Sequence, residues 1–356
     1  MKRRELILGA GAAGIAATSK LKAQTKKTFK WKMVTTWPPN FPGLGTGAIR
    51  MAKSIEKASA GRIKIKIFGA GELVPAFEVF DYVSSGGAEM GHGAAYYWRG
   101  KTEATQIFTA LPFGLNAMEM NGWLYYGGGL ELYRELYDTF NLRPFPCGNS
   151  GCQMGGWFKK EINSVADLKG LKMRIPGFGG EVLRRNGGTP VAMPGGEIFT
   201  ALQTGTIDAA EWIGPYNDLT FGMHKVAKNY YYPGWHEGGP TLECIVNKDA
   251  YSELPEDLKA IVDIAASATN DTMLAEFMAR NAFALQQIKA MEDIKISPFP
   301  KDVMRAFKKS TQEIINEIAR RDERFAKVYK SYSDYKKTVE QWTKISEYAL
   351  LKNRYE

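Results

Sequence analysis

A short internal repeat constrains the fold of this chain more than any other feature of its sequence. The stretch EVFDYVSSGGAEMG at residues 78–91 aligns without gaps to EIFTALQTGTIDAA at residues 197–210, and Glu, Phe and Gly recur at matching positions. In both copies an amphipathic helix ends at a glycine, and a short strand of small residues follows. Apolar strands at 63–67 and 172–175 precede the copies. The repeat therefore predicts two similar α/β lobes.

The two predicted lobes are interleaved along the chain. Lobe one comprises residues 29–148 together with 241–300, because TLECIVNK at 241–248 has the pattern of a strand that returns to it. Lobe two comprises residues 149–240. Residues 301–356 have a helical pattern with almost no helix breaker, which predicts long C-terminal helices that span the lobes. Strands that cross between two such lobes can act as hinges, and the carboxyl ends of both sheets then face a shared cleft.

The N-terminal stretch ELILGAGAAGIAA at residues 5–17 has the glycine spacing of a dinucleotide-binding turn. That turn needs a full strand before the glycines and an acidic residue about 20 positions after them, but no Asp or Glu occurs between Glu5 and Glu56. Residues 1–23 instead have the basic start, apolar centre and small-residue cleavage site of an export signal. The Arg3-Arg4 pair and the weakly hydrophobic centre favour the twin-arginine route over the general secretory one. We expect a soluble protein exported to the periplasm.

Charge and residue types disfavour several classes of function. Residues 1–23 contribute five basic residues and one acidic residue to the formal net charge of +9, and no arginine-rich tract occurs elsewhere. We therefore expect no nucleic-acid partner. The three cysteines have no metal-site spacing; Cys147 and Cys152 either pair in an oxidising compartment or remain two small, half-buried thiols. With three histidines and no His-Glu-x-x-His motif, the chain has little basis for histidine-dependent metal catalysis.

Several longer stretches carry a family resemblance. They are TTWPPNFPGLGTGA, AAYYWRGK, GCQMGGWF, DLKGLKMRIPGFGGEVLRRNGGTPVAMPGGEIFTALQTGTIDAAEWIGP and YYYPGWHEGGP. Together they resemble the substrate-binding receptors of TRAP (tripartite ATP-independent periplasmic) transporters, in the branch that binds 2-oxo and 2-hydroxy monocarboxylates. The resemblance covers nearly the whole chain. It implies an α/β, two-lobed periplasmic binding protein fold (type II-like) with hinge strands and long C-terminal helices. The implied partners are a pyruvate- or lactate-type ligand and the membrane subunits of a TRAP transporter.

The resemblance marks Arg174 as the residue that binds the substrate carboxylate. Arg174 lies in LKMRIPG at the end of a predicted strand, where its guanidinium can clamp a carboxylate through two parallel hydrogen bonds. Without the resemblance, a surface salt bridge would be the better interpretation of this arginine. Tyr97 is the preferred contact from lobe one, although its YYW cluster could equally be ordinary aromatic packing. Trp212 is expected to form an apolar wall that limits the ligand to a short chain, and Gln153 to hydrogen-bond the ligand.

The resemblance also implies a cation beside the substrate, held by residues that match Gln153, Glu211, the Trp212 carbonyl and Glu237. Hard cations take such carboxylate, amide and backbone oxygens. Arg174, the two carboxylates and a monocarboxylate ligand would together leave two negative charges uncompensated, which is costly in a closed cleft. Sodium would halve this excess and calcium would cancel it, so the count favours a cation and leaves Na⁺ and Ca²⁺ open.

We expect binding and no enzymatic activity. His236 beside Glu237 could suggest acid–base chemistry, but a general base also needs an activated reacting partner. No nucleophile motif such as Gly-x-Ser-x-Gly occurs in the sequence. The alternative function is a cation-dependent lyase or hydrolase that acts on small carboxylates.

An aromatic-rich stripe lies in the last helical segment. FAKVYKSYSDYKKTVEQWTKISEYALL at residues 325–351 places apolar side chains three and four residues apart. The stripe either packs back across both lobes of its own chain or reaches onto a second subunit, as in dimers of the branch that this chain resembles. On that resemblance we expect a homodimer.

Overall fold

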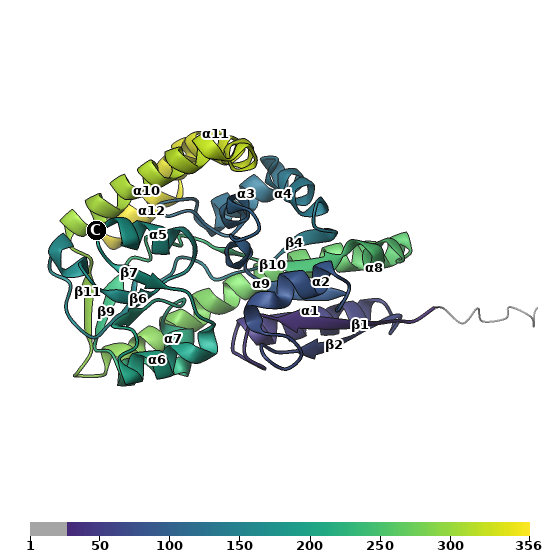
Figure 1. Cartoon of the computed structure of the whole chain (residues 1–356), viewed down its shortest axis with the longest axis horizontal. Helices are drawn as coiled ribbons and strands as arrows, with labels where there is room; N and C mark the ends of the chain where they lie inside the picture. Colours follow the sequence, from purple (N-terminus) through teal and green to yellow (C-terminus); the bar gives the residue numbers. More distant parts are fainter. Residues whose placement is uncertain (1–26) are drawn as a thin grey trace, which may run out of the picture.

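The computed structural model describes residues 27–356, so the predicted export signal at 1–23 lies outside the described residues. The described strands form two sheets, one in each of two lobes, and long helices run past both of them (Figure 1). None of the helices within 27–356 combines the length and apolar character that crossing a membrane requires.

The strands are short, as is usual for α/β domains. They are β1 (Phe29–Thr35), β2 (Ile63–Phe68), β3 (Met90–Gly93), β4 (Leu142–Asn149), β5 (Gly156–Phe158), β6 (Lys172–Arg174), β7 (Thr189–Val191), β8 (Ala209–Ala210), β9 (Asn229–Tyr232), β10 (Thr241–Asn247) and β11 (Lys295–Pro298). The α-helices are α1 (Leu44–Ala58), α2 (Val79–Ser84), α3 (Ala117–Tyr126), α4 (Gly129–Asp138), α5 (Gly177–Arg185), α6 (Ile198–Thr204), α7 (Pro215–Phe221), α8 (Lys248–Ser252), α9 (Glu256–Lys289), α10 (Lys301–Arg321), α11 (Glu323–Ile345) and α12 (Glu347–Tyr355).

The first sheet has the strand order β2-β1-β3-β10-β4. β1 runs parallel to β2 and β3, and β10 is antiparallel to β3 and β4. Alternate side chains of β1, namely Phe29, Trp31 and Met33, are buried in one cluster with apolar side chains of α1 and α9. The predicted return of TLECIVNK to lobe one is confirmed, because β10 lies inside this sheet.

The second sheet has the order β11-β9-β5-β8-β6-β7. Its first strand corrects the predicted boundary: residues 241–300 were grouped with lobe one, whereas β11 pairs in parallel with β9 of lobe two. The reason is the 34-residue helix α9, which contacts α1 of lobe one and α7 of lobe two and so carries the chain from one lobe to the other.

The internal repeat marks the same unit in both lobes. In β1–α1–β2–α2–β3 and in β6–α5–β7–α6–β8, all strands are parallel and the first lies between the other two. The glycine after the second helix has a positive φ in both copies, 81° at Gly86 and 78° at Gly205, a conformation that favours glycine. One predicted match is wrong: the strand before the second copy is β7, and Lys172–Arg174 is the counterpart of β1. The sequence did not predict β7, because its three residues, Thr-Pro-Val, are too few to show strand periodicity.

The C-terminal helices pack on both lobes. α10 contacts α5 of lobe two, where the Asn186 amide donates to Ser310 Oγ at 3.0 Å. α11 contacts α3 and α4 of lobe one, where Tyr332 Oη accepts a hydrogen bond from the Leu115 N–H at 2.7 Å. The helices therefore bridge the outer faces of the two lobes (Figure 1).

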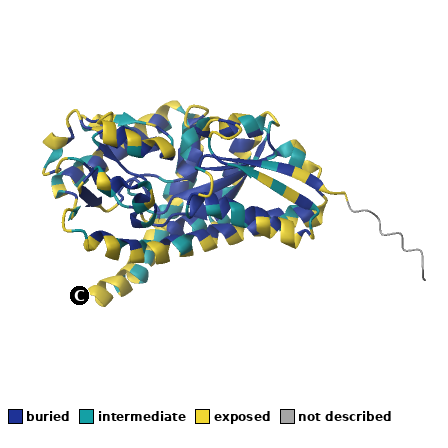
Figure 2. Ribbon diagram, turned by 90° about the horizontal axis from the view of Figure 1, so that it is seen from below, coloured by how far each residue is buried: buried dark blue, intermediate teal, exposed yellow. Residues whose placement is uncertain are grey.

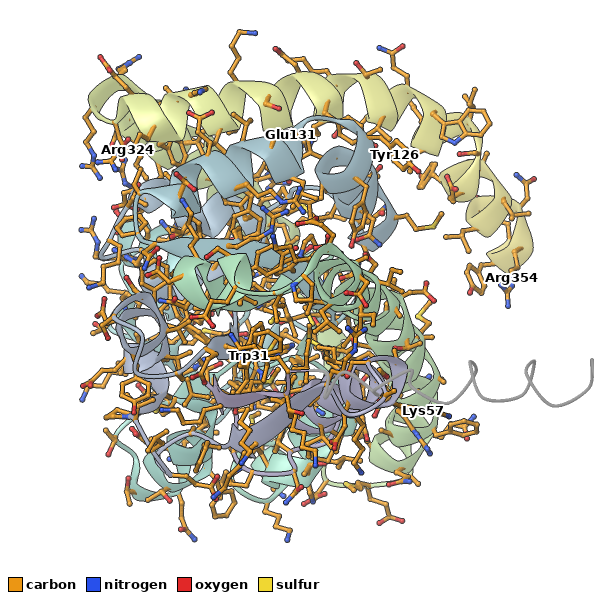
Figure 3. All side chains as sticks on the ribbon, turned by 90° about the vertical axis from the view of Figure 1, so that its right-hand side faces the viewer. Trp31, Lys57, Tyr126, Glu131, Arg324 and Arg354 are labelled. Atoms are coloured by element: carbon orange, nitrogen blue, oxygen red, sulfur yellow. The ribbon has the colours of Figure 1, made fainter. Side chains whose placement is uncertain are left out.

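The aromatic stripe of the last segment divides into two parts. Phe325, Val328 and Tyr332 are buried against the chain's own core. Trp342 and Ile345 are 63% and 72% exposed, and α12 has no buried residue. Figure 2 shows this end of the chain exposed, and Figure 3 shows α12 turning away from the body with Arg354 near its tip. The first part of the stripe is thus covered by its own chain, and the second part is not.

The cysteines are free thiols. Cys147 is buried, with its Sγ 3.2 Å from Met51 Sδ, Cys244 is buried, and Cys152 is exposed. Of the two alternatives for Cys147 and Cys152, the structure therefore has unpaired thiols.

Candidate functional site

Two strand ends of lobe two and one of lobe one meet between the lobes. Arg174 is the last residue of β6, and Glu211 and Trp212 follow β8 directly. Tyr97 lies in the short 3₁₀ helix η2 (Ala95–Trp98), just after β3. All these strands belong to the parallel units, so their carboxyl ends face the junction of the lobes, where α/β proteins bind ligands.

Gln153 and Glu237 lie on the two segments that cross between the lobes, residues 150–155 and 233–240. The Gln153 N–H donates to the Glu237 carbonyl at 3.2 Å, which joins the two segments. The Gln153 side-chain nitrogen donates to Glu237 Oε2 at 2.7 Å and to Ser150 Oγ at 3.0 Å. Gln153 is buried, and its Oε1 has no hydrogen-bond partner among the described residues. A buried amide oxygen left unpaired is costly, so this atom is suited to a donor or a cation.

Arg174 is the cationic centre of the site and is 1% exposed. Its Nη1 donates to the Glu211 carboxylate and, at 3.2 Å, to the Glu211 carbonyl. Nη2 lies 3.5 Å from the Tyr97 hydroxyl, and Cζ lies 5.0 Å from the centroid of the Trp212 ring. Burial by itself lowers the pKa of Arg174, but the neighbouring Glu211 charge and the Tyr97 contact raise it above its ordinary value. The guanidinium is therefore charged, and it is held by the protein's own carboxylate.

Glu211 is shared between two partners. One carboxylate oxygen faces Arg174, and the other, Oε2, lies 3.2 Å from His236 Nε2. Burial raises the pKa of Glu237 well above its ordinary value, and the nearby Glu211 charge adds to the rise, while Arg174 and Gln153 oppose it. The surroundings of Glu237 therefore disfavour its charged form.

These side chains fit a hard cation. Three buried residues, Glu211, His236 and Glu237, each offer one possible ligand atom. These three atoms lie within 4.8 Å of one another. The unpartnered Gln153 Oε1 belongs to a side chain that bonds Glu237. The carboxylate oxygens of Glu211 and Glu237 and the amide oxygen of Gln153 are the kinds of ligand atom that Na⁺ and Ca²⁺ prefer.

A small cavity adjoins this cluster. It is lined by Trp37, Leu44, Tyr96, Tyr97, Ser150, Gln153, Trp212, Ile213, Glu237 and Leu242. The volume of this cavity is about 10 Å³, which is room for about one water molecule. Arg174, which pairs with Glu211, contacts two of the lining residues, Tyr97 and Trp212. An organic ligand can enter only if the lobes separate or side chains move.

The structure brings all six predicted site residues together and adds three that were not assigned to the site. His236 contacts Glu211, and Ser150 contacts Gln153. Trp37 lines the cavity, and its indole N–H donates to His92 Nδ1 at 2.7 Å. Two of the three carried a sequence signal: His236 is adjacent to Glu237, and Trp37 follows β1, the first strand of the repeated unit.

The YYW cluster is divided between two environments. Tyr96 and Tyr97 line the cavity, whereas the Trp98 indole N–H donates to Glu243 in the core of lobe one. Because η2 turns the backbone at this point, neighbouring aromatic residues face opposite sides. Ordinary core packing therefore describes Trp98, while ligand contact by Tyr97 stays a prediction.

Most of the chain matches a known protein family. A model described as bacterial extracellular solute-binding protein, family 7, matches residues 33–322. A monocarboxylate 2-oxoacid-binding periplasmic protein of Nostoc sp. is 44% identical over 356 residues, covering 98% of this chain and 97% of that protein.

Three solved structures are similar over 92% of this chain. A TRAP periplasmic solute-binding protein of Colwellia psychrerythraea with bound calcium and pyruvate is 46% identical, with a TM-score of 0.90 over 100% of its chain. One from Pseudoalteromonas atlantica with sodium and pyruvate is 45% identical, with a TM-score of 0.89 over 99% of its chain. A mixed-occupancy dimer from Bordetella bronchiseptica, with copurified calcium and picolinate in one site, is 41% identical, with a TM-score of 0.91 over 98% of its chain.

Proposed function

The chain belongs to the bacterial extracellular solute-binding proteins of family 7, and from that premise we propose that it is the extracytoplasmic receptor of a TRAP transporter. Its ligand is a small 2-oxo or 2-hydroxy monocarboxylate of the pyruvate or lactate type, bound together with a metal cation. The observation that carries this proposal is the buried Arg174 beside Glu211 and Glu237 at the junction of the lobes. Similar proteins with bound pyruvate and a cation support the ligand class.

Arg174 binds the ligand carboxylate through its guanidinium fork. In the structure this fork is turned to Glu211, so ligand binding exchanges one carboxylate partner of Arg174 for another. Tyr97, at 3.5 Å from the guanidinium, hydrogen-bonds the ligand from lobe one, and Gln153 does so from the crossing segment. The Trp212 ring closes the apolar side and limits chain length.

Gln153, Glu211, Glu237 and the Trp212 carbonyl hold the cation. The cation supplies positive charge beside the two carboxylates and offsets the ligand's own charge. His236 keeps Glu211 oriented through its 3.2 Å contact with Oε2. Calcium and sodium both occur in the similar structures, and the donor set suits either.

The protein binds its ligand without transforming it, delivers it to the membrane subunits of the transporter, and does so in the periplasm after export. The family of solute-binding proteins and the periplasmic relative support this placement.

Calorimetry tests the proposal. Chelated, dialysed protein is titrated with pyruvate or lactate in buffer that contains calcium, sodium or neither, and the ligand is then recovered. Stoichiometric, cation-dependent binding with unchanged ligand is the expected result. Absence of binding to any short 2-oxo or 2-hydroxy acid contradicts the proposed function, and steady turnover would establish the lyase or hydrolase alternative in its place.

We also propose a homodimer that covers the exposed part of the C-terminal stripe. Trp342, Ile345, Tyr348 and Leu350 are each at least 60% exposed, more apolar surface than a single terminal helix normally leaves in water. The similar dimer from Bordetella supports this assembly. Removal of residues 342–356, which takes away all four of these side chains, should convert a dimer into a monomer at micromolar concentration in light scattering. A monomeric full-length chain would contradict this interface, as would a truncated chain that stays dimeric.

A further inference from the structure

The lobes also touch beside the ligand cavity, where an aromatic contact joins them. Phe41, in the loop between β1 and α1 of lobe one, stacks on Phe221 of α7 with ring centroids 4.3 Å apart. Phe41 and Trp37 both meet the Trp212 ring edge-on, with centroids 6.2 Å away. The loop of lobe one thus rests on the wall of the ligand site and on α7 of lobe two.

One buried side chain supplies a directional bond within this contact. Asn217, on α7, is fully buried, and its Nδ2 donates to the Pro42 carbonyl of lobe one at 3.0 Å. Its Oδ1 accepts a hydrogen bond from the Trp212 indole N–H at 3.3 Å. A single amide therefore links the other lobe to the ring that forms the wall of the site. Because a buried amide is costly when unpaired, both ends of this side chain matter.

The neighbouring residue fixes Asn217 to lobe two. The Asp218 carboxylate accepts hydrogen bonds from the Gly214 N–H at 3.2 Å, the Trp157 indole at 3.1 Å and the Tyr230 hydroxyl at 2.7 Å. All these donors belong to lobe two. When the lobes separate, Asn217 and Trp212 therefore move together, and the bond that breaks is the one to Pro42.

We propose that Asn217 is a positioning residue that stabilises the closed form and aligns Trp212 as the lobes close. This inference rests on the proposed function, because closure over a ligand gives the residue its purpose. The Asn217 side chain forms hydrogen bonds with the Trp212 indole and the Pro42 carbonyl. Among the described residues it forms none with Arg174 or with the side chains of Glu211 and Glu237. Substitution of Asn217 therefore shortens the lifetime of the closed complex and leaves the association rate of the ligand unchanged.

The test compares matched amide substitutions. Asn217→Asp keeps the acceptor for the Trp212 indole and removes the donor to Pro42, and Asn217→Ser shortens the side chain should the first variant fold poorly. Asn229→Asp is the control, because the Asn229 amide is also buried in lobe two and donates at 3.2 Å to the Phe158 carbonyl of the same lobe. Stopped-flow tryptophan fluorescence with pyruvate and calcium measures association and dissociation rates.

Lobe separation is measured independently of any ligand. Spin labels at Lys64→Cys of lobe one and Lys169→Cys of lobe two, in a Cys152→Ser background, report the fraction of closed molecules. Both lysines and Cys152 are exposed.

We expect pyruvate to dissociate about tenfold faster from Asn217→Asp than from the wild type, because about one buried hydrogen bond is lost. The association rate should change less than about twofold. The closed fraction falls in both Asn217 variants, with and without pyruvate, and stays unchanged in Asn229→Asp. An unchanged closed fraction in both Asn217 variants overturns the inference, as does an equal loss in Asn229→Asp. If the wild type binds no pyruvate, the proposed function fails, and the label distances still decide the role of Asn217.

Discussion

The two lobes use the same βαβαβ unit but place opposite chemistry at the same strand ends. Where the first strand of the unit ends, lobe one presents the Trp37 indole and lobe two presents the Arg174 guanidinium. After the third strand, lobe one presents Tyr97 and lobe two presents Glu211. The repeated backbone thus sets where functional side chains stand, and the residue types at those positions divide the work between the lobes.

This division indicates that lobe two and the crossing segments hold the charges, while lobe one covers them. Charges are expensive to bury, and their attraction grows when water is excluded. An aromatic cover from lobe one excludes water without adding charge to the site. We therefore expect substitutions in lobe two to determine whether a ligand binds, and those in lobe one to adjust affinity.

The largest expected effect comes from Arg174→Ala. Removing the guanidinium leaves the ligand carboxylate without the two-pronged partner that binds it in a buried site, which should weaken pyruvate binding by about 2–5 kcal/mol, or at least roughly 30-fold. Arg174→Lys keeps the charge but loses the two-pronged geometry and should fall between Ala and wild type. Calorimetry measures both.

Arg184→Ala is the control for this substitution, because Arg184 is an exposed arginine on α5 paired with Glu181. It should bind like wild type. Wild-type affinity in Arg174→Ala would mean that the assigned site is wrong and that lobe two does not carry the binding charge.

Glu243 is a buried carboxylate in lobe one that forms no ion pair within residues 27–356. Glu243 accepts hydrogen bonds from the Trp98 indole and the Tyr133 hydroxyl, and burial raises its pKa to about 7, against the opposing effect of these donors. The folded state therefore holds this proton more tightly than the unfolded state. The associated stability is present below the ordinary glutamate pKa and is lost as pH rises through about 7.

From this shift, the free energy of unfolding should fall by about 2–3 kcal/mol between roughly pH 5 and pH 8. Glu243→Gln should remove that part of the pH dependence, since an amide stays neutral. Urea unfolding across this range measures it. Asp218 in lobe two, whose pKa burial also raises to about 7, should keep a slope of the same sign in the variant. An identical slope in wild type and Glu243→Gln would show that lobe one buries an ionised carboxylate after all.

The third prediction addresses the cation. Glu237→Gln removes one of two carboxylates from the proposed cation site and should weaken calcium binding at least roughly tenfold, because affinity for hard cations follows the charge of the ligand set. Calorimetric titration of the protein with calcium, in the presence of saturating pyruvate, measures the calcium affinity. Glu243→Gln is the matched control and should leave calcium affinity unchanged, because Glu243 lies in the core of lobe one. Equal calcium affinity in Glu237→Gln and wild type would remove Glu237 from the site.

The smallest effect is expected for Tyr97→Phe. The Tyr97 hydroxyl lies 3.5 Å from Arg174 Nη2, at the outer limit of a hydrogen bond, so its loss should cost about 0.5 kcal/mol, or roughly twofold in the dissociation constant. Pyruvate titration of this variant measures the lobe-one contribution directly. A loss as large as that of Arg174→Ala would erase the proposed division between the lobes.

Much of the fold was predictable because its signals are local. The strand and helix periods, the helix-ending glycines and the repeat itself depend on residues close in sequence, and they identified two α/β lobes and the C-terminal helices. The site needed more than periodicity. Arg174, Glu211 and Glu237 stood out through the family resemblance, since an isolated arginine or glutamate at a strand end carries no such information by itself.

The sequence by itself determined the repeated unit, the residue types at its strand ends and the separation of aromatic from charged positions. Only the tertiary structure decided that Glu211 bridges Arg174 and His236, that β11 joins the second sheet, and that Asn217 reaches Pro42 across the lobes. The physical reason is range. A local pattern fixes which face of a strand or helix a side chain occupies, whereas a contact between distant segments depends on how whole elements pack, and short strands or single polar residues leave no periodic trace of that packing.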